Sequence, residues 1–238
     1  MKQISLTGAP GMKRVLVIAA HPDDEVLGCG ATMSKYSRQG VQFMVLFIAE
    51  GSSCRYVDPA CADSVAAIAE RTQQAVNALP LLGVKDYHFN DLPCGRLDQV
   101  PIIQINKAIE QAIRKFDPDT VLTHSAHDAN NDHRIVCRAT IMATRPGAQN
   151  RVARLLSYEV LSSSEWAFGE AFAPTSFERI EEQDLTLKWQ ALAAYETEVK
   201  AYPFPRSEQG VRAQAMSRGM QAGVPLAEAF YLIREFRV

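Results

Sequence analysis

The sequence predicts an α/β protein in which a mostly parallel central sheet lies between two layers of helices, a three-layer sandwich. Two observations lead to this fold class. Short, almost continuous apolar runs, such as VLVIAA at 15–20, alternate along the chain with longer segments whose apolar residues recur every three or four positions. The first pattern is typical of strands buried on both faces, and the second of amphipathic helices. Because strand and helix alternate four times, parallel strands with helices on both faces are favoured.

The predicted strands are segments of four to nine residues: most are apolar runs, whereas VKDYHF at 84–89 is predicted from its alternating pattern. They cover 15–20, 41–49, 84–89, 120–123, 155–160 and 229–233. The predicted helices end at residues that stop a helix: Gly40 after 25–39, Gly83 after 64–82, and Pro118 after 102–116. Further helices are expected over 133–144 and 183–199, and one more before the last strand.

Length and composition narrow the possible classes of protein. The chain of 238 residues is long enough for one sizeable core, and we expect a single domain over residues 1–238. Its formal net charge of −2 and the lack of a clustered Lys/Arg stripe argue against nucleic-acid binding. We expect neither a secretory signal before residue 15 nor a transmembrane segment. The five cysteines form no CxxC pair, which favours free thiols in the cytoplasm over a disulfide such as Cys54–Cys61.

Polar, metal-ligating residues follow two of the predicted strands. The sequence HPDDE comes directly after 15–20, and HSAHDANNDH comes after 120–123. The carboxyl ends of parallel strands lie at one edge of a sheet, so the two segments can converge there. Three adjacent acids would repel one another unless a cation compensates their charge.

A metal site is the chemistry that fits these residues. His21, Asp24 and His133 offer two imidazoles and one carboxylate, the pattern of a catalytic zinc site with an open position, and also a set that suits Fe²⁺. Asp23 would stay free to take a proton from water. The alternative interpretation is structural: both segments also fit helix N-caps, in which the acids accept hydrogen bonds from first-turn amides.

The same motifs carry a family resemblance. AHPDDE, then Gly28-x-Gly30, and later VLTH followed by DANNDHR, resemble the PIG-L/LmbE-like N-acetylglucosaminyl deacetylases. Further segments are similar to bacterial members: LPCGRLDQVPI, SYEVLSSSEW, YPFPRS and RGMQAGVPLAEAF. The resemblance implies a Rossmann-like fold, zinc held by His21, Asp24 and His133, and Asp23 as the general base. It also implies hydrolysis of an N-acylated amino sugar.

One position departs from the family pattern. Many members carry a histidine three residues before the ligand histidine, and here that residue is Asn130. An amide can donate a hydrogen bond to a substrate oxyanion, but it cannot transfer a proton at neutral pH. We therefore expect Asn130 to contact substrate, and the acid role to fall to Asp23, His124 or His127.

Three further residues are candidates for the site. Asp132 is expected to act in catalysis by orienting a neighbouring group, with simple helix capping as the alternative. Arg71 resembles a family arginine that holds substrate or acetate, although a solvated arginine on a helix face is the other interpretation. Arg206 is a candidate contact for a phosphate or nucleotide attached to the sugar.

The function predicted from these residues is a zinc-dependent N-deacetylase acting on a small N-acetylated amino sugar or sugar conjugate. A nucleotide-linked or lipid-linked sugar fits equally well, and the sequence does not predict the oligomeric state. Two alternatives stay open: a metal-binding protein with little or no turnover, and an amidase for a non-sugar N-acyl substrate. A non-haem iron oxygenase is disfavoured, since those enzymes usually have all-β barrels.

Overall fold

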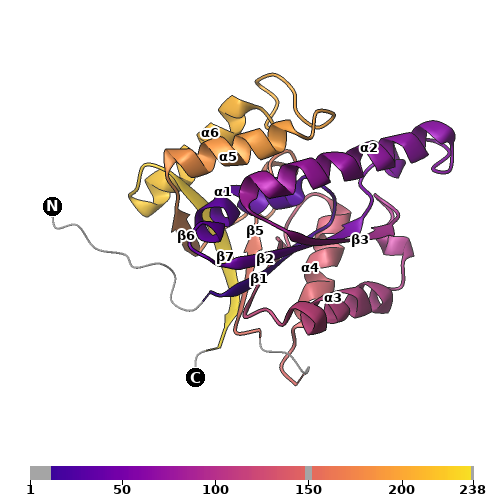
Figure 1. Ribbon diagram of the computed structural model, residues 1–238, viewed down its shortest axis with the longest axis horizontal. Helices are drawn as coiled ribbons and strands as arrows, with labels where there is room; N and C mark the ends of the chain where they lie inside the picture. Colours follow the sequence, from indigo (N-terminus) through magenta and orange to yellow (C-terminus); the bar gives the residue numbers. More distant parts are fainter. Residues whose placement is uncertain (1–11, 148–151, 237–238) are drawn as a thin grey trace.

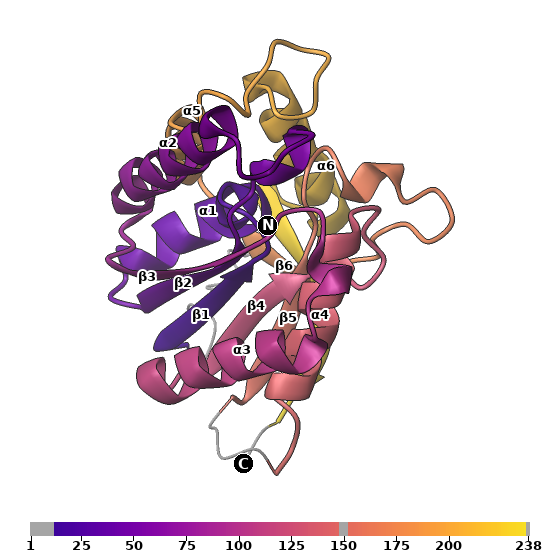
Figure 2. The same cartoon turned by 90° about the vertical axis from the view of Figure 1, so that its right-hand side faces the viewer.

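The computed structural model describes residues 12–147 and 152–236. Over these residues seven strands form one sheet in the order β3-β2-β1-β4-β5-β7-β6 (Figures 1 and 2). Their bounds are β1 Arg14–Ala19, β2 Gln42–Ala49, β3 Asp86–Leu92, β4 Thr120–His124, β5 Arg154–Tyr158, β6 Ser176–Arg179 and β7 Ala227–Glu235. The first five strands in this order pair in parallel, and β7 pairs antiparallel with β5 and with β6. The predicted α/β class with a mostly parallel sheet is confirmed.

Six α-helices of the described ranges form the two outer layers. They are α1 Asp24–Ser37, α2 Ala62–Ala78, α3 Ile102–Phe116, α4 Asn131–Ala143, α5 Glu182–Ala193 and α6 Glu208–Ala222. Helices α3 and α4 cover one face of the sheet, and α1, α2 and α5 lie over the other (Figure 1). No helix in the described part of the chain is long and apolar enough to cross a bilayer.

Strand β1 contributes to both hydrophobic cores, which explains its unbroken apolar sequence. Val15 and Val17 pack in the core beneath α1 and α5, whereas Leu16 and Ile18 pack in the core beneath α3 and α4. Successive side chains of a strand point to opposite faces, so a strand covered on both sides is apolar at every position.

The structure differs from the sequence prediction at several element ends. The helix expected over 64–82 ends at Ala78, and a 3₁₀ segment, Leu79–Leu82, with Pro80 in its first turn, completes it. The helix expected over 183–199 ends at Ala193. Strand β6 was not predicted, because four residues that pair only with β7 carry little periodicity. The expectation about a secretory signal concerns mainly residues 1–11, which lie outside the described residues.

The order of the strands identifies the edge where a ligand would bind. Strands β1 and β4 are neighbours, but β1 is followed in the chain by β2 on one side and β4 by β5 on the other. In open α/β sheets, the crevice beyond the carboxyl ends of two such strands is the usual binding place. His21 comes shortly after β1, and His124 is the last residue of β4.

Candidate active site

Two histidines and an aspartate converge beyond the ends of β1 and β4. Oδ2 of Asp24 lies 3.4 Å from Nδ1 of His21 and 3.4 Å from Nε2 of His133. The potential ligand atoms of the three residues all lie within 4.8 Å of one another, and all three side chains are buried. Asp24 begins α1 and His133 lies in the first turn of α4, so the two strand-to-helix connections bring them together.

Each imidazole has a second carboxylate on the side away from Asp24. Oδ2 of Asp132 is hydrogen-bonded to Nε2 of His21 at 2.9 Å, whereas Oδ1 of Asp128 lies at the ion-pair distance of 3.3 Å from Nδ1 of His133 without hydrogen-bond geometry. Such pairs fix the ring orientation and the tautomer that metal-ligating histidines need. Asp128 was not recognised in the sequence. A spacing of five residues does not by itself predict a contact with His133, which forms because the loop folds back on the imidazole ring.

The charges at the site favour a cation. Burial alone would raise the pKa of Asp24, but the positive charge of His133 and the hydrogen bonds with His133 and His21 outweigh burial and hold that pKa well below its usual value. Burial would lower the pKa of His133, yet Asp24 and Asp128 raise it to about 10. A protonated imidazole therefore balances the carboxylates, a role that a divalent ion can take over. Two imidazoles backed by carboxylates, together with one carboxylate ligand, fit zinc chemically.

A second possible ligand set consists of His21, Cys94 and Asp132, and it has His21 in common with the first set. It fits a metal less well, since the Cys94 thiol donates to the Cys54 sulfur and this contact, together with burial, raises the pKa of Cys94, whereas a metal ligand must be a thiolate. We therefore place the candidate metal centre on the set formed by Asp24 and the two histidines.

Asp23 lies beside this centre in a strained backbone conformation. Its φ is 112°, in the left-handed region, where a non-glycine residue persists only if its surroundings hold it. The Asp23 N–H donates to Oε2 of Glu25 over 3.0 Å, and the Tyr195 hydroxyl donates to Oε1 of the same carboxylate. Burial raises the pKa of Asp23, although Arg206 and Arg71 oppose this. Its Oδ1 atom is buried and has no hydrogen-bond partner among residues 12–147 and 152–236.

The two arginines predicted to bind substrate both contact Asp23. Oδ2 of Asp23 lies 2.5 Å from Nη1 of Arg206 and 3.1 Å from Nη2 of Arg71. The carboxylate of Glu198 bridges the same arginines at 3.0 Å and 2.6 Å. The Arg71 side chain is only 4% exposed, and it also donates to the Pro22 and Gly51 carbonyls. The interpretation of Arg71 as a solvated helix-face residue is wrong. Nothing in the sequence had indicated Glu198.

Asn130 caps helix α4, whereas Asp132 contacts His21. The side-chain oxygen of Asn130 accepts the Asp132 N–H over 2.9 Å, so Asn130 is the N-cap of α4. The Asp132 carboxylate instead accepts the N–H groups of Gly95 and Leu97 and faces His21. Capping by Asp132 is therefore wrong, and its orienting role stays a prediction supported by this contact.

The two other histidines considered as acids have different surroundings. Nε2 of His124 accepts the Ala20 N–H over 2.8 Å, and the ring stacks on His133. Burial and the charge of His133 lower the pKa of His124 to about 3, so the ring is neutral at pH 7. His127 is about half exposed and pairs with Glu170. His124 is therefore a poor proton donor at neutral pH, and the acid role considered for His127 stays a prediction.

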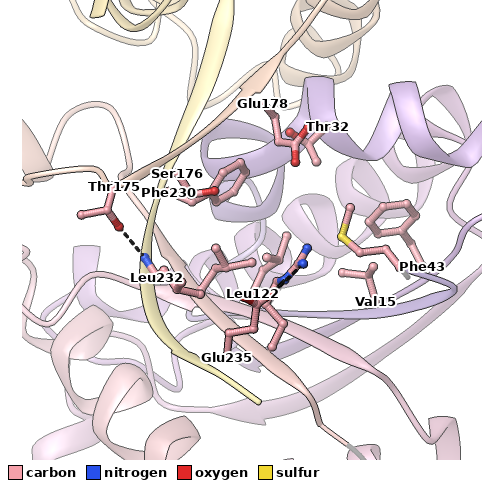
Figure 3. Close-up of a pocket in the computed structure, with 13 residues that line it drawn as sticks. Val15, Thr32, Phe43, Leu122, Thr175, Ser176, Glu178, Phe230, Leu232 and Glu235 are labelled. Atoms are coloured by element: carbon pink, nitrogen blue, oxygen red, sulfur yellow. Dashed lines mark hydrogen bonds and ion pairs between the residues drawn. The ribbon is translucent and has the colours of Figure 1, made fainter. Parts of the chain in front are cut away.

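A cavity of about 270 Å³ lies away from this site (Figure 3). Its lining includes Val15 and Arg154, which lie at the starts of β1 and β5, and Phe230 and Thr32. It therefore opens towards the amino ends of the parallel strands, the edge opposite the histidines. Ligand sites of such sheets lie at the carboxyl ends, so we do not assign the active site to this cavity.

Known structures share the fold. The N,N'-diacetylchitobiose deacetylase of Pyrococcus horikoshii superposes with a TM-score of 0.75 at 22% identity, over 93% of this chain and 84% of the other. The 4-carboxy-2-hydroxymuconate hydratase GalB of Pseudomonas putida KT2440 gives 0.73 at 22% identity, over 95% and 98%. The same fold thus occurs in a deacetylase and in a hydratase, so the fold alone does not specify the reaction.

Sequence comparison assigns the family. The uncharacterized deacetylase YaiS of Escherichia coli K12 is 29% identical over 201 residues, which cover 81% of this chain and 95% of that protein. The family model PIG-L, described as GlcNAc-PI de-N-acetylase, matches residues 16–144, a range that contains both histidine segments. The chain belongs to the PIG-L family.

Proposed function

We propose that this protein is a metal-dependent hydrolase that removes the N-acetyl group from a small N-acetylated amino sugar or sugar conjugate. The observation that carries the proposal is the convergence of His21, Asp24 and His133 next to the buried, unpartnered Oδ1 of Asp23. The description of the family as a de-N-acetylase supports amide hydrolysis over the hydration catalysed by GalB.

His21, Asp24 and His133 would hold the metal ion. A divalent cation supplies a Lewis acid that polarises the amide carbonyl and lowers the pKa of water towards neutrality. Zinc is the ion we favour, because its preferred donors are the imidazole nitrogens and the carboxylate oxygen present here; Fe²⁺ suits the same donors.

Asp23 moves the proton in this proposal. Its free Oδ1 accepts the proton that water loses on attacking the amide carbon, while Arg71 and Arg206 hold Oδ2 and keep the carboxylate oriented. Burial brings the pKa of Asp23 closer to neutrality, which suits a group that must also return the proton. The amine nitrogen of the sugar receives that proton as the C–N bond breaks, and acetate and a free amino sugar result.

Asp132 and Asp128 would act through the histidines. Each fixes one imidazole, so that Nδ1 of His21 and Nε2 of His133 point towards Asp24. Asn130 is already engaged as a helix cap through its oxygen, and its NH₂ group is the part left for a hydrogen bond to substrate.

Acetate release from a panel of N-acetylated sugars, with metal analysis of the purified protein, tests the proposal. The panel includes free, nucleotide-linked and lipid-linked N-acetylglucosamine, together with N-acetylated non-sugar amines. We expect acetate release from at least one sugar, loss of activity after chelation, and recovery on adding Zn²⁺ or Fe²⁺. Asp23→Asn should lower kcat by about 10²–10⁴-fold while metal binding is retained, since general acid–base catalysis contributes about that much.

Three outcomes would contradict the proposal. Acetate release only from non-sugar amines would favour the broader amidase. Stoichiometric metal without release from any substrate would favour a metal-binding protein with little turnover. Full activity of Asp23→Asn would remove Asp23 from the reaction.

A further inference from the structure

Two cysteines that are forty residues apart in the sequence meet beside the candidate active site. The Sγ atoms of Cys54 and Cys94 are 3.1 Å apart, and the Cys94 thiol donates to the Cys54 sulfur. Cys54 lies in the 3₁₀ segment Ser53–Arg55 after β2 and is exposed, whereas Cys94 follows β3 and is buried. The disulfide weighed from the sequence, Cys54–Cys61, is not the contact that the fold makes.

One buried carboxylate holds the two cysteine segments together. Glu50 accepts the N–H groups of Ser52 and Ser53 through Oε2, at 2.7 Å and 2.9 Å. Through Oε1 it accepts the Cys94 N–H over 2.8 Å. Burial would raise the pKa of Glu50, but these hydrogen bonds hold it below its usual value. The carboxylate is therefore charged at neutral pH and keeps its hydrogen bonds to both cysteine segments.

Gly95 shows how tightly the segments fit. A Cβ at this position would lie 2.9 Å from Cβ of Cys54, closer than real Cβ contacts. Its φ is +70°, which also favours glycine. The backbone after Cys94 therefore packs directly against the Cys54 side chain, which holds the two cysteine segments close together.

We propose that Cys54 and Cys94 form a redox-sensitive pair that closes to a disulfide when the protein meets a hydroperoxide. The Cys54 thiolate attacks one peroxide oxygen, the O–O bond breaks, and Cys54 becomes a sulfenic acid while the other oxygen leaves as water or alcohol. The Cys94 sulfur then attacks the Cys54 sulfur, the S–O bond breaks, and water leaves. Two thiols are oxidised and one peroxide is reduced, so atoms and electrons balance.

The surroundings suit these two roles. Cys54 is the exposed residue of the pair, and the hydrogen bond from Cys94 lowers its pKa to about 6, which favours the thiolate at neutral pH. Cys94 is buried, so a peroxide meets Cys54 first. Closing the bond requires the sulfurs to approach by only about 1 Å, from their present contact to the S–S bond length of about 2.05 Å.

The pair is linked to the candidate metal centre through the backbone. Gly95, the residue after Cys94, donates its N–H to Oδ2 of Asp132 over 2.6 Å, and the same oxygen faces His21. Disulfide closure pulls on the segment that supports Asp132, so the oxidised protein is expected to differ from the reduced protein in metal affinity.

Thiol counting tests the proposal with the full-length protein. After treatment with equimolar hydrogen peroxide, we expect the number of titratable thiols under denaturing conditions to fall from five to three, and to return to five with dithiothreitol. Peptide mapping should find Cys54 joined to Cys94. Cys61→Ser, the matched control in the same loop, should still lose two thiols.

Two variants separate the steps. Cys94→Ser should retain a sulfenic acid at Cys54 that dimedone traps, and Cys54→Ser should keep all four remaining thiols. The proposal is overturned if the wild type keeps five thiols, if Cys54 pairs with Cys61, or if Cys54→Ser loses thiols at the wild-type rate. Because the readout needs neither substrate nor metal, its failure is distinct from failure of the proposed deacetylase activity.

Discussion

Replacing Asp132 by asparagine tests whether this carboxylate orients His21. Asp132 is 1% exposed. Its Oδ2 lies 2.9 Å from Nε2 of His21 and accepts the Gly95 N–H over 2.6 Å, and its Oδ1 accepts the Leu97 N–H over 3.1 Å, which makes three contacts. Asparagine has nearly the same shape, but one of its two terminal atoms is a donor. Whichever way the amide turns, that donor faces at least one N–H, so at least one of the three contacts is lost.

The expected effect falls mainly on metal binding. The Asp132 hydrogen bond raises the pKa of His21 against the opposing effect of burial, so its loss makes the imidazole a weaker ligand. Losing such a partner behind a metal-ligating histidine costs about 10- to 100-fold in affinity, or about 1.4–2.8 kcal/mol. The buried N–H left without an acceptor should also lower the free energy of unfolding by about 1–3 kcal/mol.

Competition between the protein and a chromophoric chelator for Zn²⁺, well below the melting temperature, measures the affinity. Asp98→Asn is the matched control, because Asp98 lies exposed in the neighbouring 3₁₀ segment Leu97–Gln99. The control should bind Zn²⁺ as the wild type does. A Kd for Asp132→Asn within about threefold of the wild type, with only a lower melting temperature, would show that Asp132 stabilises the loop but does not support the metal ligand.

Three other predictions test packing, charge and thiol reactivity. Gly28→Ala should destabilise the protein by about 3 kcal/mol in urea unfolding, because its Cβ would lie 2.2 Å from the Tyr158 ring; unchanged stability would mean that the ring can move. Lys188→Met should cost about 3–5 kcal/mol, since the buried Glu228 carboxylate, 2.6 Å from Nζ of Lys188, then keeps two backbone N–H partners but has no counter-charge, and adding Glu228→Gln should recover part of that loss. Iodoacetamide should modify Cys54 with a midpoint near pH 6, because the lowered pKa makes the reactive thiolate available above that pH; a midpoint near pH 9, the ordinary thiol value, would contradict the contact with Cys94.

Much of the fold followed from local pattern. The unbroken apolar run of β1 indicated a strand covered on both faces, and β1 indeed contributes to two cores. The alternation of strands and helices indicated parallel pairing. Local pattern does not define every boundary: Pro80 is compatible with a helical turn, so the sequence does not show that α2 ends at Ala78. The edge strand β6 escaped because its four residues are defined by pairing with β7 alone.

The candidate metal ligands could be predicted from the sequence because they come soon after the ends of two predicted strands. His21 and Asp24 are three residues apart, and His133 follows a second strand whose end must lie at the same edge of the sheet. The sequence predicts only that the two segments share an edge; the pairing of β1 with β4, which makes them neighbours there, is seen in the structure. The supporting residues had no such signal: Glu198 reaches Arg71 and Arg206 from a turn beyond α5, and no spacing relates it to the HPDDE motif.

The sequence by itself determined the fold class, the edge of the sheet where chemistry is concentrated, and the residue types suited to a metal ion. These depend on periodicity and on neighbours a few positions apart, which the chain fixes locally. Only the tertiary structure decided which acid stands behind which imidazole, that two arginines and Glu198 surround Asp23, and that Cys54 meets Cys94. Those contacts join residues that are distant in the chain, and their distances depend on how the layers pack.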